Sequence, residues 1–338
     1  MATAGTRPLV VITDCITDGL GEEQRLLGEL ADVRAVQAMN EEQLYGHVEQ
    51  ADALLVYHTI RIREPLIRRL ERCRLIVRCG VGYDNVDIAA ARARGIPVAN
   101  VPDYGTEEVA DSAIALVLSL TRGINLLNSR LRAGAPWTFE HVRPIHRRRG
   151  SVLGIVGLGR IGSAAALRAK AFGMDVVFHD PYVADGVDKA LGLRRVETLD
   201  ELLAQSQVVS LHCPNTSETR HLMNHATIAK MPAGSYLVNT ARGGVVDPAA
   251  VLAALTTGHL AGAALDVLEQ EPPAADDPLL AAWRDPKHPA HDRLILNSHA
   301  AFYSEEGLRD MRVKGSENVR RLLLGQPPRN VVNGVQPA

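Results

Sequence analysis

The chain has 338 residues, enough for about two domains at roughly 150 residues each. Hydrophobic residues make up 46% and charged residues 22%, as in ordinary globular proteins. The formal charge of −2 and the aromatic content of 4% argue against nucleic-acid binding through a basic surface or aromatic stacking. No apolar run approaches about 18 residues, so neither a transmembrane helix nor a membrane partner is expected.

The thiols and histidines form no recognisable metal-binding pattern. The four cysteines have no zinc-ligand or redox spacing, which favours free thiols in a cytoplasmic protein. Histidine pairs such as His221 and His225 have ligand-like gaps, but no cysteine or carboxylate completes the set. No metal site is therefore predicted.

The first hundred residues alternate short apolar runs with amphipathic stretches. The runs predict strands at 9–12, 33–38, 53–57, 75–79 and 97–99. The stretches between them predict helices at 22–30, 41–48, 65–70 and 85–93. Strands that alternate with helices are typical of a parallel sheet, so this half is expected to be an α/β domain.

A second α/β series follows a helical link. Helices are predicted at 106–122 and 125–132, and the basic stretch 141–150 is interpreted as a solvated loop, with a cofactor phosphate or partner contact as the alternative. Strands are predicted at 152–156, 175–179, 207–211, 235–238, 261–265 and 294–296, and a long final helix at 304–324. The expected fold class is therefore α/β, with two doubly wound parallel sheets.

A glycine-rich turn links the first strand of the second series to its helix. Gly157, Gly159 and Gly162 form the GxGxxG pattern, which allows a tight turn, close approach of a pyrophosphate, and close packing of helix on strand. Asp180 follows the next strand, about 20 residues on, where an acidic side chain binds ribose hydroxyls and repels a 2′-phosphate. The pattern favours NAD over NADP, although such a turn can also bind nothing.

Charged residues follow three later strands of this series. Arg242 offers a planar guanidinium for a carboxylate and a carbonyl. His299 can exchange a proton near neutral pH, and Glu271 can accept a hydrogen bond from its other ring nitrogen. Ligands of open α/β sheets bind at the carboxyl ends of strands, so the set predicts hydride transfer between a nicotinamide and a 2-keto or 2-hydroxy acid.

A fourth segment lies in the first half. Val81 and Gly82 belong to a glycine-rich turn after a strand, and their amides can form an anion site for the substrate carboxylate. The alternative is a tight turn in which Asp84 or Asn85 caps the next helix. The two interpretations are compatible.

These motifs together resemble the D-isomer-specific 2-hydroxyacid dehydrogenases along nearly the whole chain. The shared segments are 80–85, 157–162, 239–244, 264–267 with Glu271-Pro272, and His299. Within that family, segments 57–60, 169–173, 180–182, 190–192 and 300–305 are most similar to the C-terminal-binding proteins. Those corepressors carry a tryptophan where this chain has Phe302, which implies a different substrate pocket.

The resemblance implies a fold, a site and an assembly. It implies a flavodoxin-like substrate domain at 1–103 and 304–338, a Rossmann NAD-binding domain at 104–303, a cleft between them, and a homodimer. It implies catalysis by Arg242, Glu271 and His299. The implied NAD contacts are Thr106, Gly157, Gly159, Arg160, Ile161, Gly162, Asp180, Cys213, Thr240 and Asp266, and the implied substrate contacts are Val81, Gly82, Arg242 and Phe302.

Three functions fit these residues. The first is an NAD-dependent D-2-hydroxyacid dehydrogenase, or 2-keto acid reductase. The second is an NADH-responsive scaffold for protein partners, like the C-terminal-binding proteins, with residual catalysis. The third is oxidation of phosphite or another small oxyanion on the same residues.

Overall fold

The computed structural model describes residues 7–336, which divide into two compact units. One unit contains the described residues up to Tyr104 together with those from Ser304 onward, and the other contains Gly105–Tyr303. Each unit has its own parallel sheet. The expected α/β class with two doubly wound sheets is confirmed.

The first unit is built on a five-stranded sheet in the order β2-β1-β3-β4-β5, the flavodoxin-like order. The strands are β1 (Leu9–Asp14), β2 (Asp32–Ala38), β3 (Ala53–Val56), β4 (Leu75–Arg78) and β5 (Val98–Asn100). Its helices are α1 (Gly21–Leu27), η1 (Glu41–Leu44), α2 (Glu64–Ile67), α3 (Ile88–Ala93) and α12 (Glu305–Leu323). The apolar strands β3 and β4 are fully buried, as expected of strands covered on both faces.

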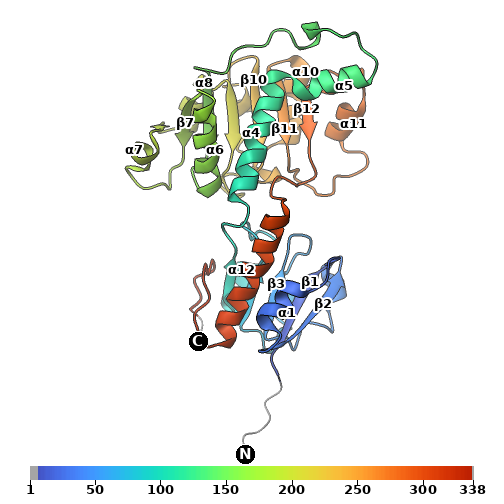
Figure 1. Ribbon diagram of the computed structural model, residues 1–338, viewed down its shortest axis with the longest axis vertical. Coiled ribbons are helices and arrows are strands. Elements are labelled where there is room, and N and C mark those ends of the chain that lie inside the picture. The colour runs from blue at the N-terminus through green and yellow to red at the C-terminus, as the bar shows by residue number, and fades with distance from the viewer. Residues whose placement is uncertain (1–6, 337–338) are drawn as a thin grey trace, which may run out of the picture. The chain divides into compact units, whose positions relative to one another are not determined.

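The C-terminal helix α12 completes the first unit. In Figure 1 this red helix lies beside the blue strands and α1, and Met311, Val319 and Leu322 enter the same apolar cluster as Leu27 of α1. On the opposite face, η1, α2 and α3 supply Leu44, Leu66 and other apolar side chains. A long helix from the end of the chain therefore forms part of the core around the first strands.

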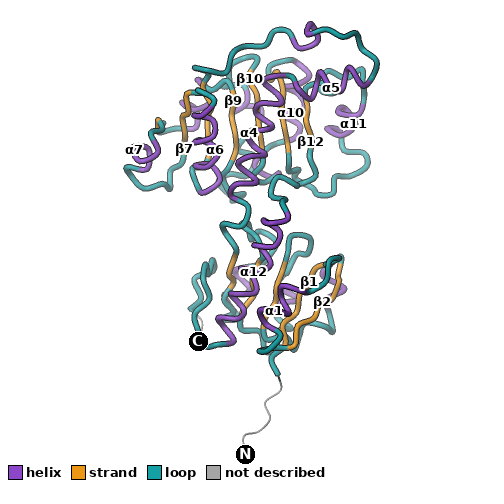
Figure 2. The backbone as a smooth tube through the Cα atoms, in the orientation of Figure 1, coloured by secondary structure: helices purple, strands orange, loops and turns teal. Residues whose placement is uncertain are grey.

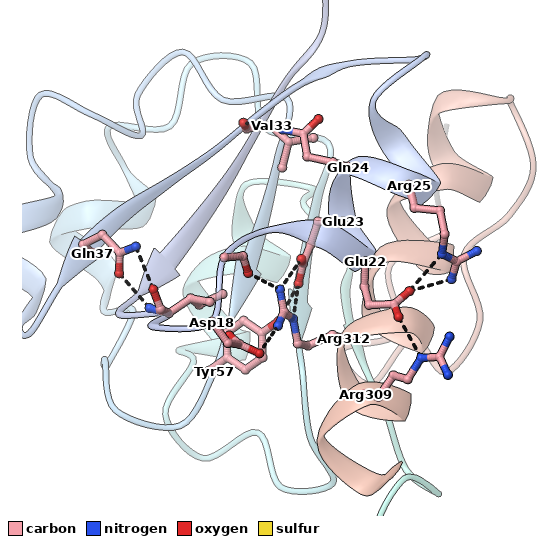
Figure 3. Close-up of polar contacts among 12 residues, drawn as sticks. Asp18, Glu22, Glu23, Gln24, Arg25, Val33, Gln37, Tyr57, Arg309 and Arg312 are labelled. Atoms are coloured by element: carbon pink, nitrogen blue, oxygen red, sulfur yellow. Dashed lines mark hydrogen bonds and ion pairs between the residues drawn. The ribbon is translucent and has the colours of Figure 1, made fainter. Parts of the chain in front are cut away.

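A buried ion pair joins α12 to α1. The Arg312 guanidinium donates to both carboxylate oxygens of Glu23, at 2.7 and 2.6 Å, and to Asp18 at 2.7 Å (Figure 3). Glu23 is fully buried, and the Tyr57 hydroxyl donates to it at 3.2 Å. The Glu23 hydrogen bond raises the pKa of Arg312 against the opposing effect of burial. The polar end of Tyr57 is therefore part of this internal network.

The second unit has a seven-stranded sheet in the order β12-β11-β10-β9-β6-β7-β8. This is the Rossmann order with one additional strand. The strands are β6 (Val152–Val156), β7 (Asp175–His179), β8 (Arg194–Arg195), β9 (Val208–Leu211), β10 (Ser235–Asn239), β11 (Leu260–Leu265) and β12 (Leu294–Leu296). All their pairings are parallel.

Helices cover both faces of this sheet. Figure 2 shows α4 and α6 in front of the strands, and their side chains share a cluster with β6, β7 and β10. A second cluster joins the other face to α8, α9, α10 and α11. The helices are α4 (Thr106–Arg122), α5 (Ile124–Arg132), η2 (Phe139–Val142), α6 (Arg160–Ala171), α7 (Val187–Leu191), α8 (Leu199–Gln205), α9 (His225–Ile228), η3 (Gly243–Val245), α10 (Pro248–Thr257) and α11 (Pro278–Arg284).

Two sequence expectations concern the helices 41–48 and 106–132. The helix predicted at 41–48 is wrong in extent, because only the short η1 forms before Tyr45 adopts an extended backbone. Within residues 7–336, no single helix is long and apolar enough to cross a membrane; α4 and α5 reach that length and composition only as a pair, and the chain bends by 64° between them.

Candidate active site

The residues predicted to bind cofactor or to catalyse lie in the second unit, most of them at the carboxyl ends of its parallel strands. Gly157 follows β6, Asp180 follows β7, Cys213 follows β9, and Arg242 follows β10. Asp266 follows β11 directly, and His299 follows β12. The parallel topology therefore brings residues that are far apart in sequence to one edge of the sheet, which is where α/β proteins bind ligands.

The glycine turn after β6 is shaped for a ligand. Gly157 has φ +89°, and a Cβ there would lie 2.7 Å from the Cys213 amide nitrogen. A Cβ on Gly162 would lie 2.1 Å from the Gly157 carbonyl oxygen. At Gly159, by contrast, a Cβ would meet no atom within 4 Å. The first and third glycines thus allow close packing, and the second faces open space.

The helix after this turn presents its amino end at the same place. The first hydrogen bond of α6 runs from the Ser163 amide to the Gly159 carbonyl at 2.9 Å. The amides of Arg160, Ile161 and Gly162 precede it and have no acceptor within the helix. Such amides, together with the helix dipole, suit a pyrophosphate.

Asp180 is held at the glycine turn by backbone donors. Its Oδ2 accepts from the Leu158 amide at 2.8 Å, and its Oδ1 accepts from the Tyr182 amide at 2.9 Å. The carboxylate is half-buried, so lone pairs on both oxygens stay available to further donors. A carboxylate beside a phosphate-binding turn fits a ribose with free hydroxyls.

Buried polar and thiol groups surround the same edge. The Thr240 hydroxyl is buried and has no hydrogen-bond partner among the described residues. Burial raises the pKa of the Cys213 thiol to about 11, so this side chain is neutral at physiological pH. An orphaned buried hydroxyl needs a partner, and a nucleotide would supply one. Together with the open Gly159 turn and Asp180, these residues fit NAD.

Glu271 and His299 form a hydrogen-bonded pair. Glu271 Oε2 lies 2.7 Å from His299 Nδ1, and the two side chains are 35% and 29% exposed. Glu271 Oε1 accepts from the Leu268 amide at 2.8 Å. Burial by itself would raise the pKa of Glu271, but the hydrogen bond from His299, its charge, the Leu268 amide and the Arg242 charge together lower it. Glu271 is therefore ionised near neutral pH.

Arg242 is placed by tight packing between two loops. A Cβ on Gly243 would lie only 1.9 Å from the Leu268 carbonyl carbon, so the loop after β10 lies directly against the loop after β11. The Arg242 carbonyl accepts from the Asn239 side-chain amide at 2.9 Å. Arg242 Nη1 donates to the Ala241 carbonyl at 2.8 Å. This packing fixes the arginine loop beside the loop that carries Glu271.

Asp266 organises the histidine loop. Its buried carboxylate accepts from the amides of Ala300 and Ala301 at 3.0 to 3.1 Å, and its carbonyl accepts from the His299 amide at 2.7 Å. His299 itself has φ +55°, a region that non-glycine residues rarely adopt. Strain of this kind persists where the surroundings enforce it, commonly in active sites. The sequence motif identified Asp266 but not this contact.

The remaining predicted residues occupy flanking positions. Phe302 packs edge-on to His299, with ring centroids 6.2 Å apart and planes at 82°. Thr106 is the first residue of α4. In the first unit, the amides of Val81 and Gly82 donate no hydrogen bond to another described residue, while the Val81 carbonyl accepts from Asn100 at 2.7 Å. Two amides without an acceptor among the described residues are compatible with an anion site in that turn.

The first-unit turn is braced by a side chain in a way that the sequence did not predict. Asn85 donates to the carbonyls of Tyr57 and Ile60, both at 2.8 Å, and accepts from Arg78 Nε at 3.2 Å. It thus joins the loops that follow β3 and β4, rather than capping the next helix. Asp87 provides that cap, by accepting from the Ala90 amide.

Across residues 7–336, no group of three or more His, Cys, Asp or Glu side chains has the geometry to hold a metal ion.

Comparison with known proteins identifies the family. The model of the D-isomer specific 2-hydroxyacid dehydrogenase NAD binding domain matches residues 114–301. The chain belongs to the D-isomer-specific 2-hydroxyacid dehydrogenase family. The expectation from the sequence motifs is thereby confirmed.

Individual relatives support the same conclusion. C-terminal-binding protein 1 of Caenorhabditis elegans is 33% identical over 338 residues, which cover 98% of this chain and 45% of that protein. D-3-phosphoglycerate dehydrogenase of Methanocaldococcus jannaschii is 35% identical over 319 residues, covering 94% of this chain and 59% of that protein. The chain thus spans about half the length of these curated relatives, and it resembles both branches to a similar degree.

A solved structure matches the whole fold. The D-lactate dehydrogenase of Aquifex aeolicus, complexed with NAD and lactic acid, aligns with a TM-score of 0.83 at 29% identity. The alignment covers 94% of this chain and 96% of that one.

Proposed function

We propose that the protein is an NAD-dependent D-2-hydroxyacid dehydrogenase that interconverts a small 2-keto acid and its D-2-hydroxy acid. The observation that carries this proposal is the 2.7 Å bond between Glu271 and His299 beside the Arg242 loop, on a unit whose glycine turn fits NAD. The family match and the similarity to a lactate dehydrogenase bound to NAD support it.

The side chains divide the reaction between them. NADH, when bound, supplies the hydride that reduces C2 of the keto acid. Because Glu271 engages Nδ1 of His299, Nε2 is the nitrogen that gives a proton to the developing alkoxide. The ionised Glu271 stabilises the protonated imidazole during reduction. Arg242 binds the substrate carboxylate and polarises the carbonyl.

We also propose roles for the two units. Residues 1–103 and 304–338 are assigned to substrate binding, with the amides of Val81 and Gly82 holding the carboxylate. Residues 104–303 are assigned to NAD binding through the ten contacts named from the resemblance. Phe302, in contact with His299, would face the substrate side chain and limit its size.

The protein is further proposed to form a homodimer in the cytoplasm. Ile124, Trp137 and Phe139, in the segment from α5 to η2, are 58%, 91% and 67% exposed, and burying such side chains against a second copy is favourable. The free thiols of the four cysteines suit a reducing compartment. Light scattering of the purified protein tests the dimer, and cell fractionation tests the location.

A substrate panel tests the activity. Purified protein should oxidise NADH in the presence of at least one 2-keto acid, followed by the loss of NADH absorbance, and chiral chromatography should give the D product. His299→Ala should lower kcat about 10²- to 10⁴-fold. His225→Ala, an exposed histidine at the start of α9, is the matched control and should leave turnover unchanged. Absence of turnover with every 2-keto acid would contradict the proposal.

The scaffold hypothesis predicts a different result. The similarity to C-terminal-binding protein 1 is the reason to test this hypothesis. If the protein is a scaffold, it should bind a peptide partner in an NADH-dependent manner. The His299→Ala variant should then bind that partner almost as well as the wild type. The complete acid–base pair favours the enzyme, because a scaffold does not need Glu271 to hold His299.

A further inference from the structure

The loop after β9 has an internally braced structure. The Thr216 amide donates to the Thr219 hydroxyl at 2.8 Å, and that hydroxyl donates to the Pro214 carbonyl at 2.5 Å. The Arg220 amide donates to the Thr216 carbonyl at 2.9 Å. His221 follows with φ +48°, a left-handed conformation that costs free energy in a residue with a side chain. The loop therefore presents Arg220 and His221 in a defined direction.

The backbone of this loop is bonded to the arginine loop. The His221 amide donates to the Gly244 carbonyl at 2.8 Å, and the Met223 amide donates to the Val245 carbonyl at 3.1 Å. Gly244 and Val245 lie in the short helix η3, which begins at the residue after Arg242. The loop after β9 is thus fixed to the loop that carries the substrate-binding arginine.

The side chains of the same loop contact the acid–base loop. Glu269 Oε2 lies 3.1 Å from His221 Nε2, and Glu269 Oε1 lies 2.7 Å from Arg220 Nη2. Each oxygen of this carboxylate therefore has its own nitrogen partner. Glu269 lies two residues before Glu271, and its neighbour Leu268 donates its amide to Glu271.

We propose that Arg220 and His221 form a clip on Glu269, and that Glu269 is thereby a positioning residue for the Glu271–His299 pair. The clip fixes the 268–271 turn against the arginine loop, so that Glu271 stays within hydrogen-bond distance of His299. This inference rests on the proposed dehydrogenase function, because the clip acts through the acid–base pair of that reaction.

The expected effect follows from the exposure of the clip. Glu269 is 32% exposed and Arg220 is 58% exposed, so the ion pair contributes little to global stability. A displacement of about 1 Å in a catalytic group, however, can cost about a hundredfold in rate. Releasing the clip should therefore reduce turnover far more than it reduces the melting temperature.

The variants separate positioning from a general structural effect. Glu269→Gln should lower kcat about tenfold or more and change KM by less than about threefold, because proton transfer suffers while Arg242 still binds the carboxylate. Arg220→Met combined with His221→Leu should have the same effect. Arg220→Lys and His221→Gln, which keep a donor to Glu269, should retain most activity. Asp200→Asn breaks the exposed 2.5 Å pair with Lys230 in the same unit and should have no effect.

A second measurement does not depend on catalysis. Hydrogen exchange of the amides in 266–271 should become severalfold faster in Glu269→Gln than in the wild type, with the segments outside the two clipped loops unchanged. A Glu269→Gln variant with wild-type kcat and wild-type exchange in this segment would refute the clip. So would a loss of kcat in Arg220→Lys or His221→Gln as large as that in the Arg220→Met, His221→Leu double variant. Lack of turnover in the wild type would refute the dehydrogenase proposal instead, and the exchange experiment would still decide the clip.

Discussion

The buried pair between Arg312 and Glu23 makes a quantitative prediction about the first unit. Replacing Arg312 by Met removes the guanidinium that donates to both Glu23 oxygens at 2.7 and 2.6 Å, while the Tyr57 hydroxyl still donates to Oε1. Glu23 is fully buried, so its charge would be left without compensation by solvent. Breaking a buried pair in this way costs about 3–5 kcal/mol.

That loss corresponds to a large change in thermal stability. For a unit of this size, 1 kcal/mol shifts the melting temperature by roughly 3–4 °C, so a decrease of about 10–20 °C is expected. The double variant Glu23→Leu with Arg312→Met should recover most of the loss, because apolar side chains can replace a buried ion pair at little cost. Comparing single and double variants therefore separates an unpaired charge from lost packing.

Two spectroscopic probes distinguish the units. Both tryptophans, Trp137 and Trp283, lie in the second unit, and Trp283 packs against its core. Far-ultraviolet circular dichroism reports both units, while the tryptophan emission reports the second one. The Arg312→Met variant should lower the melting temperature that is measured by circular dichroism. A decrease of less than about 3 °C, or about 1 kcal/mol, would refute the reasoning that the pair is buried and structurally required.

Three further predictions concern the second unit. Asp180→Asn should raise the ratio of NADPH- to NADH-dependent kcat/KM by about tenfold or more, since it removes the charge that repels a 2′-phosphate; an unchanged ratio would count against the ribose role. Gly243→Ala places a Cβ 1.9 Å from the Leu268 carbonyl carbon and should lower kcat/KM more than about a hundredfold, with NADH affinity by fluorescence titration little changed. Burial lowers the pKa of His212 to about 4. The folded state therefore binds fewer protons than the unfolded state, and stability should be full above about pH 6.5 and decline by up to about 3 kcal/mol towards pH 4. Denaturant titrations should show that decline in the wild type and a flatter profile in His212→Gln.

Much of the architecture can be predicted from the amino-acid sequence. Short apolar runs such as 53–56 and 75–77 predict strands buried on both faces, and their alternation with helices predicts parallel sheets. The glycine turn and Arg242, Glu271 and His299 are recognisable because each chemistry needs a particular residue type at a particular strand end. The prediction of a helix at 41–48 was wrong in extent, because the amphipathic pattern of this segment does not show that the backbone of Tyr45 is extended.

Contacts between residues that are far apart in the sequence become visible in the folded chain. Arg312 and Glu23 are separated by almost the whole chain, and no local pattern links them. The contact between His221 and Glu269 joins the loops after β9 and β11, and Asp266 caps 300–301 from the loop after the neighbouring strand, so both depend on how the loops at this edge of the sheet pack. Periodicity and propensity report the environment of a residue along its own helix or strand. The partner of a buried charge is set by strand order and loop packing, which exist only in the folded chain.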